Sequence, residues 1–147
     1  MADEAIWTYA SQVTLEASGA SAASGAFVAA NDAAMSSANH GNFPLADFAL
    51  TCDFGAAVAG GVFVGLYRQD LNIDGTADAP APTVSTYEET LVGMFKLPSG
   101  QSASATYPLT DVPLTSQCQF SIKNATAQSM SVGWVLKVTP KTLEPAA

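Results

Sequence analysis

The chain has 147 residues, of which 48% are hydrophobic and 12% charged, and its formal net charge is −8. This length supports one domain with its own core, and the acidic balance argues against nucleic acid as a partner, because such a surface repels phosphate backbones. No apolar run approaches the roughly 18 residues of a membrane span, and the acidic start lacks a signal peptide's basic and apolar segments. We therefore expect a soluble protein, made and used without export.

An N-terminal arm, residues 1–11, precedes the first recognisable strand. It carries three large apolar side chains, Ile6, Trp7 and Tyr9, among small and polar neighbours. Such side chains either pack on the domain's own core or are available to a partner, and they are typical anchors at interfaces. The sequence alone leaves both alternatives open.

Strand patterns follow the arm along the chain. Residues 47–54 alternate without error, so that one face is apolar and the other polar, as in a half-buried strand. Residues 62–68 are apolar on both sides, as expected for a central strand of a sandwich. The inward side chains expected from 47–54 are Phe48, Leu50, Cys52 and Phe54, and further strands are expected at 12–17, 91–97 and 107–114.

The last part of the domain contains two more alternating segments. Residues 117–123 and 130–138 each place apolar side chains at every second position, and the residues between them are typical of a turn. We therefore expect a hairpin of two strands folded back on each other. Its inward residues would be Cys118, Phe120, Ile122, Met130, Val132, Trp134, Leu136 and Val138.

Seven or eight short strands with no convincing helix predict an all-β fold, an antiparallel β-sandwich or jelly roll with an extended N-terminal arm. We expect one β-sandwich domain over 12–142, because no repeat or linker divides it, and a frayed tail over 143–147. The apolar character of both sides of 62–68 also favours an oligomer, a dimer or trimer.

The loop after the central strand resembles part of a calcium site. Oxygen-bearing side chains alternate at Asp70, Asn72, Asp74 and Asp78, with a glycine in the sixth position. However, the twelfth position is Ala81, where a bidentate Glu is needed, and Asp, Asn and Gly are also ordinary turn residues. These four residues are the candidate calcium ligands, and a plain turn explains them as well.

Other reactive residues do not assemble into a catalytic pattern. His40 is the only histidine, in a polar loop where we expect it to be solvated, and the pair Glu88–Glu89 would point to opposite faces of a strand. Cys52 and Cys118 both lie on apolar faces; they either pair as a disulfide or are two small buried hydrophobes. No Gly-x-Ser-x-Gly elbow occurs. We therefore expect that the protein is not an enzyme. We also expect it to bind no cofactor other than calcium at the loop after the central strand.

The chain resembles the cement, or decoration, proteins of tailed-bacteriophage capsids over roughly residues 62–142. The resemblance lies in Gly65–Arg68, in the loop Asp70–Thr83, in Tyr87 with Leu91–Leu97, and in the ending Cys118–Thr142. It implies a jelly-roll sandwich that sits outside a capsid shell, usually as a small oligomer, and reinforces junctions between shell subunits. The family has no catalytic residues to carry over.

The expected function is therefore that of a virion structural protein. The expected partners are the major capsid protein and further copies of this chain, with neither nucleic acid nor membrane, and the expected location is the capsid exterior after synthesis in the host cytoplasm. A carbohydrate-binding β-sandwich, such as a lectin or a phage fibre module, is the alternative. It would use exposed aromatic residues with Asp or Asn, and calcium at the loop.

Overall fold

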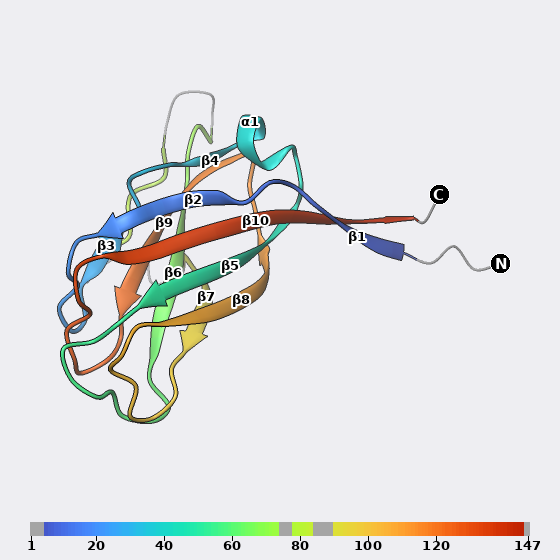
Figure 1. Ribbon diagram of the computed structural model, residues 1–147. Helices are drawn as coiled ribbons and strands as arrows, with labels where there is room; N and C mark the ends of the chain where they lie inside the picture. The colour runs from blue at the N-terminus through green and yellow to red at the C-terminus, as the bar shows by residue number, and fades with distance from the viewer. Residues whose placement is uncertain (1–4, 74–77, 84–89, 146–147) are drawn as a thin grey trace.

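The computed structural model describes residues 5–73, 78–83 and 90–145, which form two antiparallel sheets packed as a sandwich (Figure 1). One sheet, here the arm sheet, contains β1 (Ala5–Tyr9), β2 (Val13–Gly19), β5 (Leu45–Cys52), β8 (Ala105–Pro113) and β10 (Trp134–Pro145). The other, the opposite sheet, contains β3 (Phe27–Ala29), β4 (Met35–Ser36), β6 (Phe63–Asp70), β7 (Leu91–Lys96) and β9 (Gln117–Asn124). One short helix, α1 (Ser37–His40), precedes β5.

The strand order is that of a jelly roll. The arm sheet runs β2-β10-β5-β8 and the opposite sheet runs β3-β9-β6-β7, with β4 continuing the line of β3 along β9. Strands that follow each other in the chain therefore mostly cross between the sheets, as in a double Greek key. The predicted all-β sandwich is confirmed, and so is the central place of residues 62–68, because β6 lies between β9 and β7.

The predicted hairpin at 117–139 is wrong. Strands β9 and β10 lie in different sheets and do not pair. Strict alternation specifies which face of a strand is buried but not which strand lies beside it, so two strands that face one core from opposite sides show the same pattern. Hydrogen bonds of the buried Asn124 side chain hold the connection between β9 and β10. Its amide group donates to the carbonyls of Ala22 and Gln128, and its Oδ1 accepts from the hydroxyl of Thr126.

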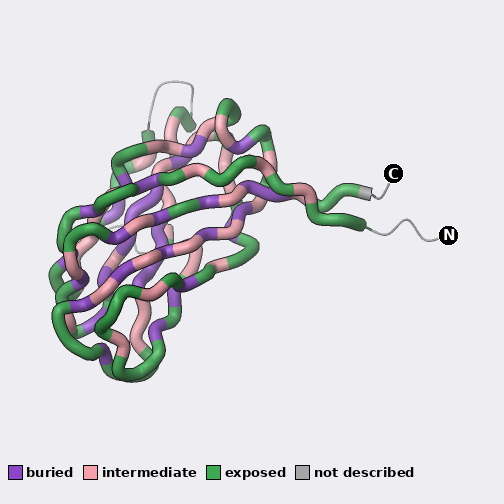
Figure 2. The backbone as a smooth tube through the Cα atoms, in the orientation of Figure 1, coloured by how far each residue is buried: buried purple, intermediate pink, exposed green. Residues whose placement is uncertain are grey.

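The core lies between the sheets, and along β5 buried residues alternate strictly with less buried ones (Figure 2). The four inward residues expected from 47–54 are all buried, as are all those expected from the last two strands except Val132, which is 70% exposed. Trp134 fills the space beside Gly19, where even a Cβ would lie 1.9 Å from the indole, and its Nε1 donates to the Ala20 carbonyl at 2.8 Å.

Two further expectations need correction. His40 is buried rather than solvated: its Nε2–H donates to the Ser116 carbonyl and its Nδ1 accepts the Asn42 N–H. The ring thus connects the backbone at Asn42 with the backbone at Ser116, a long-range contact that its polar sequence neighbours do not reveal. The tail is not frayed over 143–145, because these residues continue β10 and pair with β1; residues 146–147 lie outside the described residues.

Replacement of Trp134 by alanine should lower the free energy of unfolding by about 3–5 kcal/mol, because it leaves a large cavity beside Gly19. Chemical denaturation measures this difference. The matched control is Val132→Ala, two residues away and largely exposed, which should change stability by no more than about 0.5 kcal/mol. Equal effects of the two substitutions would show that the indole is not part of the core.

Candidate functional site: the terminal arm

The two ends of the chain form a two-stranded ribbon that leaves the sandwich. Strand β1 pairs only with the end of β10, from Tyr9 opposite Lys141 to Ala5 opposite Pro145. Strand β5 pairs with β10 no further than Lys141, and β2 stops at Val138. Beyond those points β1 and β10 continue together away from the body, and Ala5 and Pro145 pair at the tip (Figure 1). We call this ribbon, residues 5–9 with 141–145, the arm.

Large apolar side chains of the arm are exposed. The exposed fractions are 51% for Ile6, 44% for Trp7, 53% for Tyr9 and 53% for Leu143. Half of the large exposed hydrophobic residues in the described part of the chain are thus gathered on this one ribbon. Clustering of this kind, unlike single exposed residues, indicates an interaction surface.

Cross-strand partners in an antiparallel pair point to the same face, so the register assigns each side chain to one side of the arm. Trp7 with Leu143, and Tyr9 with Lys141, lie on the first face. Ile6 with Glu144 lies on the second face, where the Thr8 hydroxyl also donates to a Glu144 carboxylate oxygen at 3.3 Å. Both faces of the arm therefore carry exposed apolar side chains.

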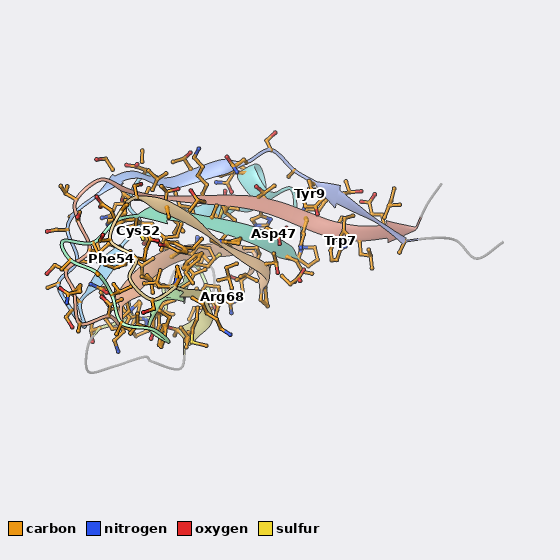
Figure 3. All side chains as sticks on the ribbon, turned by 60° about the horizontal axis from the view of Figure 1, so that its bottom comes forward. Trp7, Tyr9, Asp47, Cys52, Phe54 and Arg68 are labelled. Carbon is orange, nitrogen blue, oxygen red and sulfur yellow. The ribbon has the colours of Figure 1, made fainter. Side chains whose placement is uncertain are left out.

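The root of the arm is held by the buried side chain of Lys141. Figure 3 labels Trp7 and Asp47, two of the residues that contact this lysine. The ammonium group of Lys141 lies 2.6 Å from a carboxylate oxygen of Asp47 and 2.6 Å from one of Asp111. It also lies over the indole ring of Trp7, 4.4 Å from the centroid, which is cation–π geometry. This cluster joins β5, the end of β8, β10 and β1 at one point.

Burial disfavours the charged form of Lys141, but hydrogen bonds and charge interactions with Asp111 and Asp47 outweigh it and raise the pKa of the lysine. Asp111 is placed for this by an unusual backbone, with φ of 60°. Asp is among the few non-glycine residues that adopt this left-handed conformation readily. The Asp111 N–H also donates to Asp47 Oδ1 at 3.1 Å, which locks the two carboxylates in place.

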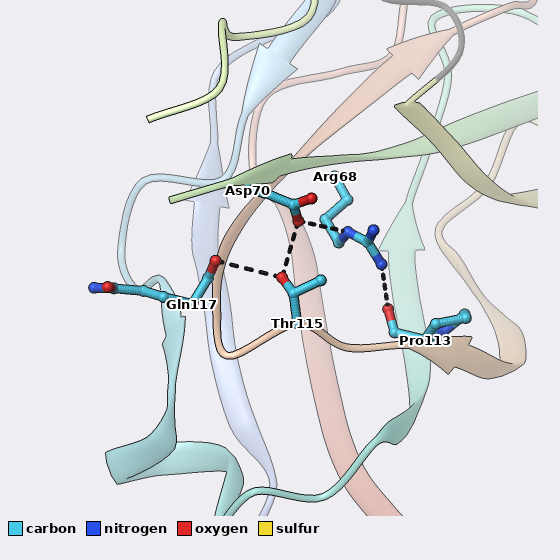
Figure 4. A network of polar contacts seen from close by, with 5 residues as sticks. All are labelled: Arg68, Asp70, Pro113, Thr115 and Gln117. Carbon is cyan, nitrogen blue, oxygen red and sulfur yellow. Dashed lines mark hydrogen bonds and ion pairs between the residues drawn. The ribbon is translucent and has the colours of Figure 1, made fainter. Parts of the chain in front are cut away.

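The candidate calcium ligands are engaged with other protein groups (Figure 4). Asp70 forms an ion pair with Arg68 Nε at 2.9 Å and accepts from the Thr115 hydroxyl at 2.9 Å, while Arg68 Nη1 donates to the Pro113 carbonyl and so bridges the two sheets. Asp78 accepts the backbone N–H of Asn72 at 3.1 Å.

Asp74 lies outside the described residues, as do Glu88 and Glu89. Among the described residues, no three His, Cys, Asp or Glu side chains are grouped so as to hold a metal ion. Calcium at this loop stays a prediction.

The two cysteines are free and buried. Burial, with the nearby Asp53 charge, raises the pKa of Cys52 to about 12, and burial likewise raises the pKa of Cys118. The thiolate is the reactive form, so both thiols are inert at neutral pH. They serve as small core hydrophobes, the second of the two alternatives considered above.

A second apolar surface lies on the outer face of the opposite sheet, and we call it the β6–β7 face. The Phe27 and Tyr67 rings pack edge-to-face across it, with centroids 4.7 Å apart, and Leu91 and Met94 are exposed beside them. At its end a pocket of about 400 Å³ is lined by Gly61, Val62, Phe63, Met94, Lys96 and Leu97.

The sequence pointed to Ile6, Trp7 and Tyr9 but missed Leu143, Lys141, Asp47 and Asp111. Leu143 was hidden because Pro145 and the small residues after it are typical of a loose end. The apolar alternation that ends at Val138 does not lead to Leu143, because Leu143 shares its phase with the polar residues Thr139 and Lys141. The lysine cluster joins residues from four separate segments, and no local pattern reports such a contact.

Comparisons with protein-family models, with curated proteins and with solved structures find no match for this chain. In the described part of the chain, no helix has the length and apolar character needed to cross a bilayer.

We expect Lys141→Met to lower the free energy of unfolding by about 2 kcal/mol, because it leaves two carboxylates facing each other at the arm root. This is less than for a fully buried pair, since the Asp111 side chain is 58% exposed. The control Lys137→Met removes an exposed lysine of the same strand and should have little effect.

The effect of Lys141 should depend on pH in a defined direction. A lysine whose pKa is raised by folding contributes its full stabilisation below the unfolded value of about 10.4 and loses it as the pH rises through the folded value. The difference in melting temperature between wild type and Lys141→Met should therefore be constant near neutral pH and shrink above about pH 10.5. A difference that grows at high pH would contradict the ion-pair assignment.

Proposed function

We propose that this protein is a capsid decoration protein of a tailed bacteriophage, which binds the outside of the shell and reinforces contacts between shell subunits. The observation that carries the proposal is the arm: a narrow ribbon with four large exposed apolar side chains, projecting from a jelly-roll body. The resemblance of residues 62–142 to such proteins supports it independently. In this proposal the protein has no catalytic role and needs no cofactor.

The energetics of the arm favour a partner. A two-stranded ribbon outside a larger sheet is marginal in water. Burying a large apolar side chain gains about 1.5–3 kcal/mol, so four of them supply enough for specific binding even after the cost of association. The partner that we propose is the major capsid protein, at the virion exterior, after assembly in the host cytoplasm.

We propose further that the protein forms a dimer or trimer through the β6–β7 face. Among the outward strand residues of this face, the only charged side chains are Lys96 and Lys123. The whole chain, by contrast, has a formal net charge of −8. A second copy therefore offers both an apolar surface and compensating carboxylates. In the trimer, a ring with head-to-tail contacts satisfies this arrangement without placing two like faces together.

Removal of residues 1–11 should leave a folded domain that binds capsids less well, because β1 contacts only the end of β10. The sharper variant replaces Ile6, Trp7 and Tyr9 by serine and should weaken capsid binding at least tenfold, each lost apolar contact being worth about 1.5–3 kcal/mol. Co-sedimentation with undecorated capsids measures binding, and a thermal melt measures folding.

The control for the arm variant is Val132→Ser, an exposed apolar residue at the other end of β10. A large drop in melting temperature with unchanged capsid binding would contradict the role of the arm. Calcium-dependent binding to a glycan array, together with no capsid binding, would favour the carbohydrate-binding alternative.

The oligomer should be visible by light scattering after size exclusion. Wild type should elute with a mass two or three times 15.0 kDa at micromolar concentration. Met94→Glu should shift the protein towards the monomer, because it places a charge in the apolar contact, whereas Thr106→Glu on the exposed surface of the arm sheet should not. A wild-type monomer at high micromolar concentration would speak against self-association in solution.

A further inference from the structure

Exposed apolar side chains lie on both faces of the arm. One face carries Trp7, Tyr9 and Leu143, which are 44%, 53% and 53% exposed, and the other carries Ile6, which is 51% exposed, beside Thr8 and Glu144. A partner that met the arm as a flat surface would cover one of these faces and leave the other in water. Such an arrangement would forfeit about 1.5–3 kcal/mol for each large side chain left out.

The edges of the arm are open as well as its faces. Among the described residues, nothing pairs with the outer edge of β1, and β10 beyond Lys141 has β1 as its only neighbour. Backbone N–H and C=O groups along a free strand edge are a template for hydrogen bonds with a further strand or loop. A partner that surrounds the ribbon can satisfy these groups together with the side chains.

The charges of the arm select among possible partners. Lys141 is already neutralised by Asp47 and Asp111, so this cluster and the adjoining Glu144 together carry a net charge of −2. The sequence continues from Ala5 into Glu4 and Asp3, two more acids. A second copy would bring the same negative charge, whereas a partner with basic groups is complementary.

We infer that the arm inserts into a cleft of the partner protein, with apolar walls on both sides of the ribbon and basic groups towards the arm tip. The inference rests on the proposed function, because the cleft is assigned to the capsid protein. The lysine cluster suits this role, since it fixes the root of the arm and so lowers the entropy lost on insertion. In this arrangement the partner contacts both faces of the arm and not one face alone.

Single cysteines on the two faces test the inference. Ile6→Cys and Leu143→Cys are matched, with exposed fractions of 51% and 53% on opposite faces. The native thiols are buried and of raised pKa, so wild type should remain unlabelled by a maleimide and provide the blank. If Ile6→Cys weakens binding, Thr8→Cys replaces it as the probe, because Thr8 lies on the same face and its substitution keeps all four apolar side chains.

The labelling rate is measured for each variant free and bound to undecorated capsids. We expect labelling at both faces to slow at least tenfold on capsids, and Val132→Cys, at the far end of β10, to be unaffected. Protection of one face only, or of neither face in protein that still co-sediments, overturns insertion but leaves capsid binding intact. If the cysteines of the free protein become protected from labelling as its concentration rises, a second copy covers the arm. This result also overturns insertion into the capsid protein.

Failure to co-sediment under any condition overturns the proposed function and the insertion with it. The charge argument has its own readout. Capsid affinity should fall as salt is raised, because salt screens the attraction between the acidic arm and a basic cleft. An affinity that rises with salt would overturn the basic lining of the cleft.

Discussion

The ammonium group of Lys141 determines where the sandwich ends and the arm begins. It is bound by Asp47 from β5 and by Asp111 from the end of β8, and it lies against the ring of Trp7 from β1. Four strands therefore converge on one charge. A buried ammonium without these carboxylates would be costly, so the lysine and the two aspartates depend on one another. Because β10 is anchored here, its last residues leave the body in a defined direction.

The same strand is anchored a second time at its other end. Trp134 fills the space left by Gly19, and its indole N–H donates to a backbone carbonyl, so this buried donor is paired. Between these anchors β10 pairs with β2 and β5 and forms the middle of the arm sheet. One long strand thus belongs to the core at its start and to the exposed ribbon at its end. This continuity links the stability of the body to the position of the arm.

The two apolar surfaces of the molecule are separate and chemically different. The arm is narrow, carries exposed apolar side chains on both faces and is negatively charged around its root. The β6–β7 face is broad, aromatic and flanked by Lys96 and Lys123. A protein that uses one surface for its own copies and the other for a shell can assemble without competition between the two contacts.

Local patterns in the sequence determined the strands, the burial of Phe48, Leu50 and Trp134, and the all-β class, because a two-residue period is a property of each strand by itself. The partners of each strand were decided only by the tertiary structure. Residues 117–123 and 130–138 alternate like a hairpin yet lie in opposite sheets, since alternation reports a buried face and not a neighbour. Likewise the aromatic residues of the arm were visible in the sequence, but Leu143 and the Lys141 cluster were not. Their contacts join distant segments, and long-range contacts leave no local signature.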